Sequence, residues 1–339
     1  MNTNSCEKIV VLGTGGTIAG TAADRADNIG YTAAQVGVAQ LLEGLPGLPS
    51  VLGGRTLLSE QVAQIDSKNM NFPVWQRLAE RLCFYLAQTK VKGVVITHGT
   101  DTLEETAYFL HSVLPPVLLS KPVVLTCAMR PASSVAPDGP QNLMDAVSVA
   151  GTAGACGVMV VCAGTLHGAV DVQKVHPYRL DAFDSGDCGP LGYVEEGHVR
   201  LVRSWPLASI NEYNYYIKII AKMGESIVWP RVDIVMSFAG ASGAMVDTLL
   251  ATASHPSNAG LPVTVSAPMR GLVVAGTGNG TVHCDLEAAL LRAQEAGIVV
   301  VRATRCPQGR VLPISGSAIA DSDGLSPVKA RIALMLALL

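Results

Sequence analysis

Short apolar runs rich in β-branched residues alternate with amphipathic stretches over most of this 339-residue chain. A helical stretch, LAERLCFYLAQ (78–88), lies between the first two runs. The runs of the first half are KIVVLG (8–13), GVVITHG (93–99), PVVLTC (122–127) and GVMVVCAG (157–164). Runs that are apolar throughout are typical of parallel strands buried on both faces. The chain is therefore predicted to be α/β, beginning with a doubly wound, mostly parallel sheet.

The same alternation returns after a polar stretch that holds Tyr213, Tyr215 and Tyr216. Strand-like VDIVMSFAG, GLVVAGTG and IVVVRATR then alternate with helical segments at about 243–253, at 286–297 and at the C-terminal end. We therefore expect a larger N-terminal domain at 1–206, a linker at 207–229 in which IKIIAKM forms a short helix, and a smaller C-terminal α/β domain at 230–339.

Composition excludes several classes of function. A net charge of −3 gives no basic face for nucleic acid, and no run reaches the roughly 20 apolar residues of a membrane span. The opening residues lack the apolar core of a signal peptide, which makes the cytoplasm the expected compartment. The eight cysteines show no CxxC or Cys/His ligand spacing, so reduced core thiols are expected and no metal or cofactor.

A glycine-rich loop, GTGGTIAG (13–20), directly follows the first predicted strand. It is not a dinucleotide fingerprint, because Ile18 stands where the third glycine belongs, and it has no Lys-Ser or Lys-Thr of a phosphate loop. The loop offers a hydroxyl, Thr14 or Thr17, at the C-terminal edge of the sheet, where ligands bind in α/β folds. A tight turn that needs glycine for positive φ explains it equally well.

A second polar group follows the strand that ends near His98. Thr100 and Asp101 come at its tip and just before a predicted helix, whose free amides suit an anion or an oxyanion. Thr102 and Glu105 have the spacing of a capping box. His98 is predicted to be a core histidine rather than a base.

These two segments resemble the bacterial-type L-asparaginases, whose hallmarks are a TGGTIAG loop and an HGTDTxEETA segment about ninety residues later. Further matches extend the resemblance over the chain: DSKNM (66–70), AMRP (128–131), DGPQNL (138–143), GPLGY (189–193), AGTGNG (275–280) and LSPVKARIALMLAL (325–338). The resemblance implies a homotetramer built as a dimer of dimers, with each active site between one subunit's N-terminal domain and its partner's C-terminal domain. It implies hydrolysis of L-asparagine, with L-glutamine left open as a second substrate.

The resemblance also implies roles for individual residues. Thr17 matches the nucleophile and Tyr31 the loop tyrosine that hydrogen-bonds it. Thr100 matches the second catalytic threonine and Asp101 the carboxylate that binds the substrate ammonium. The remaining substrate-binding matches are Ser67 and Lys68, with Asp66 and Gly99 beside them in the two motifs, and Asn279, which the partner subunit lends.

One departure from the family concerns its catalytic lysine. Counting from the DGP motif, the aligned position is Ala153, so the sequence predicts that this lysine is absent. Lys174, in DVQKVHPY, is assigned to a different lysine of the family, and Lys68 is expected to supply part of the missing charge. Lys68 and the shortened segment RCPQGRVLPISGSA (305–318) leave open an amidohydrolase of altered substrate. The missing lysine leaves open a weakly active or silent amino-acid-binding homologue.

Overall fold

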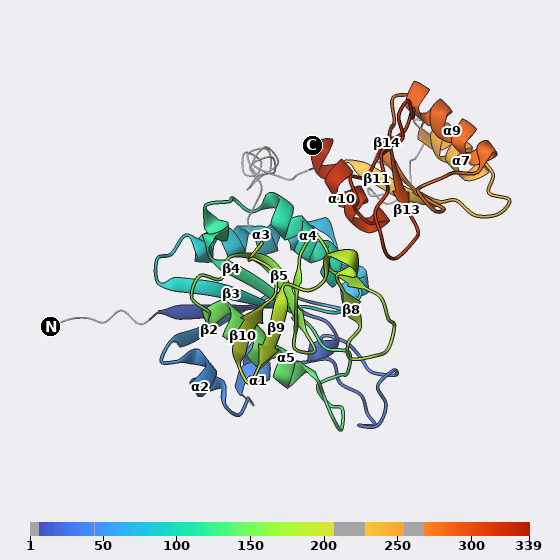
Figure 1. The fold of residues 1–339 in the computed structure, drawn as a ribbon. Coiled ribbons are helices and arrows are strands. Elements are labelled where there is room, and N and C mark those ends of the chain that lie inside the picture. Colours follow the sequence, from blue (N-terminus) through green and yellow to red (C-terminus); the bar gives the residue numbers. More distant parts are fainter. Residues whose placement is uncertain (1–6, 44, 207–227, 254–267) are drawn as a thin grey trace. The chain divides into compact units, whose positions relative to one another are not determined.

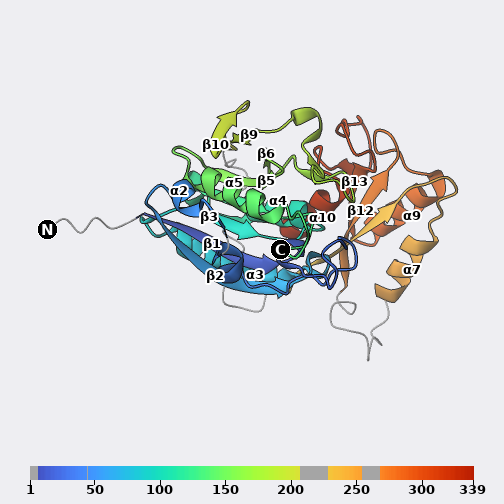
Figure 2. The same cartoon turned by 90° about the horizontal axis from the view of Figure 1, so that it is seen from below.

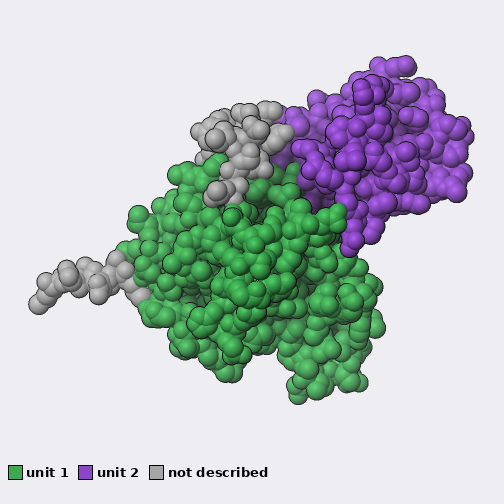
Figure 3. All heavy atoms as spheres, in the orientation of Figure 1, with its two compact units in different colours: residues 1–223 green, residues 224–339 purple. Residues whose placement is uncertain are grey.

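The computed structural model describes residues 7–43, 45–206, 228–253 and 268–339. The chain divides into two compact units, residues 1–223 and 224–339, coloured separately in Figure 3. The expected linker, its tyrosines and its short helix lie outside the described residues except at positions 228 and 229. Each unit is described by itself.

The first unit is built on an eight-stranded sheet of order β10-β9-β6-β5-β4-β3-β1-β2. The five strands β2, β1, β3, β4 and β5 run parallel, whereas β6, β9 and β10 join by antiparallel pairing. The strands are β1 (Lys8–Gly15), β2 (Thr56–Ile65), β3 (Val91–Thr97), β4 (Pro122–Thr126), β5 (Gly157–Cys162), β6 (Thr165–Gly168), β9 (Gly192–Glu195) and β10 (His198–Leu201). A separate two-stranded pair is formed by β7 (Gln173–Lys174) and β8 (Phe183–Asp184).

Helices cover both faces of this sheet, which is why its central strands are apolar throughout. Residues Ile9 to Leu12 of β1 are completely buried. One face packs against α1 (Val38–Glu43), α2 (Leu48–Leu52) and α5 (Gly139–Gly151). Figure 1 shows α3 (Phe72–Leu86) and α4 (Leu103–Val113) on the opposite face, and Figure 2 shows α5 lying along the strands. Short 3-10 helices are η1 (Thr17–Ala19), η2 (Ser67–Asn69), η3 (Leu118–Ser120) and η4 (Gly186–Cys188).

The second unit holds a parallel four-stranded sheet, β11 (Arg231–Met236), β12 (Met269–Gly276), β13 (Val299–Thr304) and β14 (Ala320–Asp321). Side chains of α7 (Ala244–Ala253) and α9 (Cys284–Glu295) form a core with one face, and α10 (Pro327–Ala337) packs on the other (Figure 1). The predicted fold class, a larger doubly wound domain with a smaller α/β domain, is confirmed.

Two simpler expectations fare differently. Cys127 and Cys162 are buried free thiols, but Cys188, Cys284 and Cys306 are exposed, so the prediction that the cysteines are core residues is wrong for these three. They sit in loops or at a helix start, where no apolar run buries them. None of the helices within the described residues is both long and apolar enough to cross a bilayer.

Candidate active site

The glycine-rich loop after β1 is a tight turn and also presents a hydroxyl. Gly15 and Gly16 adopt φ values of 99° and 82°, a region that glycine occupies without penalty. A Cβ on Gly16 would collide with the backbone of Gly99, so this glycine lets the loops after β1 and β3 touch. The turn and the presented hydroxyl are therefore parts of one feature.

Thr17, rather than Thr14, carries the available hydroxyl of this loop. Thr14 Oγ1 donates to the Thr97 carbonyl at 2.9 Å and so ties β1 to β3. Thr17 begins η1, and its Oγ1 lies 2.6 Å from the hydroxyl of Tyr31. The loop pattern by itself left the two threonines equivalent, and their hydrogen-bond partners distinguish them.

Three polar side chains cluster at the end of β3, two from the loop that follows it and one from β7. Lys174 Nζ donates to Thr100 Oγ1 at 2.8 Å and to Asp101 Oδ1 at 2.7 Å. Thr100 is buried and its hydroxyl faces Asp101 Oδ1 at 3.4 Å, while the side chain of Lys174 is only 18% exposed. A threonine hydroxyl beside a partly buried ammonium is cheaper to deprotonate than one in water.

This cluster corrects the expectation that Lys68, and not Lys174, supplies the positive charge beside Thr100. Ala153 lies in an exposed turn after α5, whereas the short strand β7 brings Lys174 to the threonine. Lys174 was not assigned to this position because the prediction counted residues from the DGP motif. The lysine lies on the short β7–β8 pair, which has no periodic sequence pattern.

The role expected for Lys68 is also wrong. Its ammonium pairs with Asp66 Oδ2 at 3.0 Å, and its side chain is 67% exposed. Hydrogen bonding to the Asp66 carboxylate raises the pKa of Lys68, so the pair is a charged one at the rim of the site. Lys68 does not take the position beside Thr100.

Ser67 links the loops after β2 and β3. Its Oγ accepts the backbone N–H of Asp101 at 3.2 Å, and its carbonyl accepts the Thr102 hydroxyl at 2.8 Å. A side chain on Gly99 would collide with Ser67 Oγ, which explains the glycine of the HGTD motif. The capping box expected at Thr102 is not formed, because that hydroxyl is committed to Ser67 and makes no cap hydrogen bond to α4.

Two family models match this chain, one in each compact unit. The family model described as "Asparaginase, N-terminal" matches residues 8–207, and "Glutaminase/Asparaginase C-terminal domain" matches residues 231–339. The chain belongs to the asparaginase family. It is therefore an amidohydrolase, as the two sequence motifs predicted.

Individual relatives of this asparaginase-family chain match it over nearly its full length. L-asparaginase 2 of Escherichia coli K12 is 36% identical, covering 97% of this chain and 88% of the relative. Glutaminase-asparaginase of Pseudomonas fluorescens is 34% identical, covering 97% and 86%. The crystal structure of a probable cytoplasmic L-asparaginase from Campylobacter jejuni superimposes with a TM-score of 0.84 at 33% identity, covering 98% and 95% of the two chains.

Asn279 lies in the second unit of this asparaginase-family chain, in the turn after β12. Its Oδ1 accepts the N–H of Leu312 at 2.7 Å and its Nδ2 donates to the carbonyl of Leu312 at 3.3 Å. Arg302, which is buried, donates from Nη1 to the Asn279 carbonyl at 2.8 Å. The asparagine side chain is exposed but held in one orientation.

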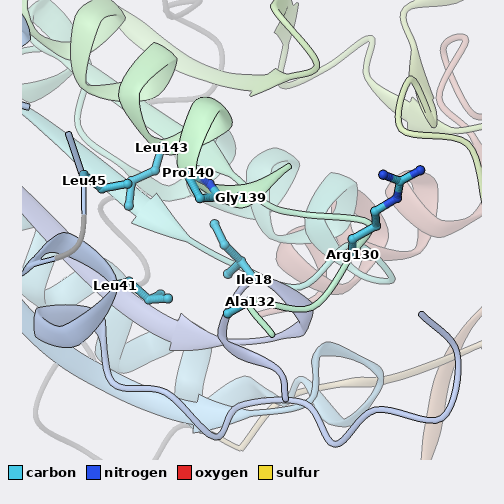
Figure 4. Close-up of a pocket in the computed structure, with 8 residues that line it drawn as sticks. All are labelled: Ile18, Leu41, Leu45, Arg130, Ala132, Gly139, Pro140 and Leu143. Atoms are coloured by element: carbon cyan, nitrogen blue, oxygen red, sulfur yellow. The ribbon is translucent and has the colours of Figure 1, made fainter. Parts of the chain in front are cut away.

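A small cavity of about 50 Å³ lies against the side chain of Ile18, the residue that follows Thr17 in sequence (Figure 4). Its wall is mostly apolar, and Figure 4 shows the guanidinium of Arg130 extending away from it. The lining residues are Ile18, Leu41, Leu45, Arg130, Ala132, Gly139, Pro140 and Leu143. None of them belongs to the polar cluster, so this cavity is a packing gap and not the site of chemistry.

Sequence reasoning passed over one group that resembles a metal site. His283, Cys284 and Asp285 have potential ligand atoms within 4.8 Å of one another, the one such group within the ranges that the structure describes. Consecutive residues are not a familiar ligand spacing, which is why the sequence did not point to it. The ring Nδ1 of His283 accepts the Asp285 N–H and so caps α9, which gives the histidine a structural role.

Proposed function

We propose that this chain hydrolyses the side-chain amide of L-asparagine to aspartate and ammonia through an acyl-enzyme on Thr17. The observation that carries the proposal is the Lys174–Thr100–Asp101 cluster beside a loop that presents Thr17 to Tyr31. A hydroxyl is a weak nucleophile until a neighbouring group accepts its proton. The 2.6 Å contact with Tyr31 supplies that neighbour.

In the first half-reaction, Thr17 Oγ1 attacks the amide carbon and its proton passes to the hydroxyl oxygen of Tyr31, which at the same time gives its own proton to the amide nitrogen. The tetrahedral intermediate collapses to an ester on Thr17 once the leaving nitrogen has taken up a proton, and ammonia departs. In the second half-reaction, water adds to the ester and Thr17 leaves with a proton, which regenerates the free enzyme. Thr100 is proposed to activate this water, because Lys174 stabilises negative charge on its oxygen.

Substrate binding is proposed at the same strand ends. The Asp101 side chain is 50% exposed although Lys174 holds one of its oxygens, so it is suited to bind the substrate's α-ammonium. Ser67 and the neighbouring Asp66 and Gly99 are proposed to receive the rest of the amino-acid head. In a homotetramer built as a dimer of dimers, Asn279 of a second copy would complete the site.

Relatives named glutaminase-asparaginase make L-glutamine the second substrate to test. Glutamine is one methylene longer, and a single methylene changes selectivity by only about 10–200-fold. We therefore propose asparagine as the main substrate with glutamine turned over more slowly.

The test is ammonia release from L-asparagine and L-glutamine by the parent and by Thr17→Ala. The parent is expected to release ammonia and the variant to lose about 10³-fold or more in kcat. Thr32→Ala is the matched control, because Thr32 is an exposed threonine next to Tyr31 and should retain full activity. A Thr17→Ala enzyme with more than a tenth of the parent's turnover would rule out the acyl-enzyme.

A further inference from the structure

The residue that precedes the catalytic loop, His98, is completely buried and uses both ring nitrogens. Nδ1 lies 2.7 Å from the carbonyl oxygen of Gly99, and Nε2 lies 2.9 Å from Thr106 Oγ1 on α4. Thr106 Oγ1 in turn accepts the indole N–H of Trp75 on α3 at 2.8 Å. Three consecutive elements, α3, the end of β3 and α4, thus meet behind the site.

In the series of hydrogen bonds from Trp75 to Gly99, the chemistry of the groups fixes which one donates and which one accepts. The Gly99 carbonyl can only accept, so Nδ1 of His98 must carry a proton. Burial lowers the pKa of His98 to about 4, so near neutral pH the ring has one proton and Nε2 is an acceptor. The indole N–H can only donate, so the Thr106 hydroxyl accepts from Trp75 and donates to His98.

The last hydrogen bond of this series, from His98 Nδ1 to the Gly99 carbonyl, holds the peptide unit between Gly99 and Thr100. That unit is planar, so holding its carbonyl toward the ring also fixes the direction of the Thr100 N–H and the position of the Thr100 Cα, to which the side chain is attached. Gly99 has no Cβ and no room for one against Ser67, so contacts of its own side chain cannot set this orientation. The hydrogen bond from His98 supplies the constraint on this peptide unit that Gly99, without a side chain, cannot supply.

We infer that Trp75, Thr106 and His98 form a one-directional hydrogen-bond relay that positions Thr100 against Lys174. The inference rests on the proposed function, and it makes these three positioning residues and not catalytic ones. The relay explains why a fully buried histidine stands next to the active loop without facing it. Because its parts lie on α3, α4 and the end of β3, the packing of two helices determines the geometry of the catalytic threonine.

The test compares Thr106→Val, Thr106→Ser and Trp75→Phe in the full-length protein. Thr106→Val keeps the shape of the side chain and removes the hydroxyl, so kcat should fall on the order of 10- to 100-fold while KM for asparagine stays nearly constant. Thr106→Ser restores the hydroxyl and should recover most of kcat. Trp75→Phe leaves the bond from Thr106 to His98 intact and should have the smallest effect, because phenylalanine also keeps the stacking on Phe109.

Ser112→Ala is the matched control for the loss of a buried hydroxyl on α4. Ser112 Oγ donates to the Tyr108 carbonyl within the same helix and has no link to Gly99. A Thr106→Val enzyme whose kcat equals that of Ser112→Ala would overturn the inference, and so would a Thr106→Ser enzyme as impaired as Thr106→Val.

A spectroscopic readout separates the relay from the proposed function. Nitrogen-15 spectra of uniformly labelled parent protein should show the His98 ring protonated at Nδ1 alone, and Thr106→Val should shift both the His98 Nε2 resonance and the Thr100 amide resonance. A parent ring protonated at Nε2, or a Thr100 amide that ignores the substitution, would overturn the relay whether or not ammonia is released. A parent that releases no ammonia would instead refute the proposed function.

Discussion

The ends of β3 and β2 both carry a motif of the family, yet they hold their charged groups in opposite ways. After β3, Thr100 is 5% exposed and the Lys174 side chain that contacts Thr100 and Asp101 is 18% exposed, although the Asp101 side chain is itself 50% exposed. After β2, Lys68 is 67% exposed and makes an ion pair with its near neighbour Asp66. The first is a three-part cluster closed by a distant residue, and the second is a local pair at the rim.

The difference teaches that a lysine inside a ligand-binding motif is not thereby part of the catalytic machinery. Hydrogen bonds and charge interactions strengthen where water is excluded, so the β3 cluster can alter the reactivity of a hydroxyl. An exposed pair such as Asp66–Lys68 is screened by solvent and contributes little. Four predictions test this comparison.

The largest effect is expected from removing the lysine of the buried cluster. Lys174→Met deletes the donor to both Thr100 and Asp101 and leaves a carboxylate without its partner, so kcat for asparagine should fall about 10³-fold or more. Steady-state ammonia release measures it, with folding checked by thermal unfolding. If this variant kept most of its turnover, the Lys174 cluster after β3 would be no more important for catalysis than the exposed pair after β2.

Buried His98, at the end of β3, should also make the free energy of unfolding depend on pH. The pKa of His98 is lowered from 6.5 to about 4, so the unfolded chain binds a proton between these values that the folded chain does not. Stability is therefore complete above about pH 6.5 and falls as the pH drops toward 4, by roughly 3 kcal/mol from this residue.

Denaturant unfolding at several pH values measures this acid slope. His98→Gln should flatten it, whereas His198→Gln, at an exposed histidine, should leave it unchanged. An acid slope that is the same in the parent and in His98→Gln would show that His98 is protonated equally in both states.

Tyr31 tests whether the nucleophile depends on its hydrogen-bond partner. Tyr31→Phe removes the hydroxyl that lies 2.6 Å from Thr17 Oγ1 and keeps the ring, so kcat should fall on the order of 10²-fold, the size expected for one proton-transfer group. Rapid-quench kinetics should show that the first half-reaction, release of ammonia, is the slowed step. An unchanged first half-reaction would assign the proton of Thr17 to another group.

The smallest effect is expected at the rim. Lys68→Met should leave kcat within about threefold of the parent, because the ammonium is exposed and bound to Asp66 rather than to Thr100. Any change in KM should shrink as salt is added, since exposed charges are screened. A loss of kcat comparable to that of Lys174→Met would restore the catalytic role first expected for Lys68.

Local patterns in the sequence predicted most of the fold and much of the site. Apolar runs predicted the central strands, and the loops after β1 and β3 were recognised because glycines and threonines follow buried strands directly. Lys174 was missed because the strand that carries it is two residues long and has no periodic pattern. The relay through Thr106 was missed because it depends on how α3 and α4 pack, which no short motif encodes.

Some predictions keep that status. The domain limits at 206 and 230 remain predictions. The homotetramer and the partner role of Asn279 are also predictions, which solution mass measurements and mixed-subunit complementation can test. A cytoplasmic location is also a prediction, since relatives include both a probable cytoplasmic asparaginase and a probable periplasmic one.

The central claim is that Thr17 carries the acyl group. Its most direct test is to quench the protein in acid during turnover of L-asparagine and to map the modified peptide by mass spectrometry. We expect an aspartyl ester on Thr17, present in the parent and absent in Thr17→Ala. An ester on Thr100, or full turnover with no trapped ester on any residue, would contradict it.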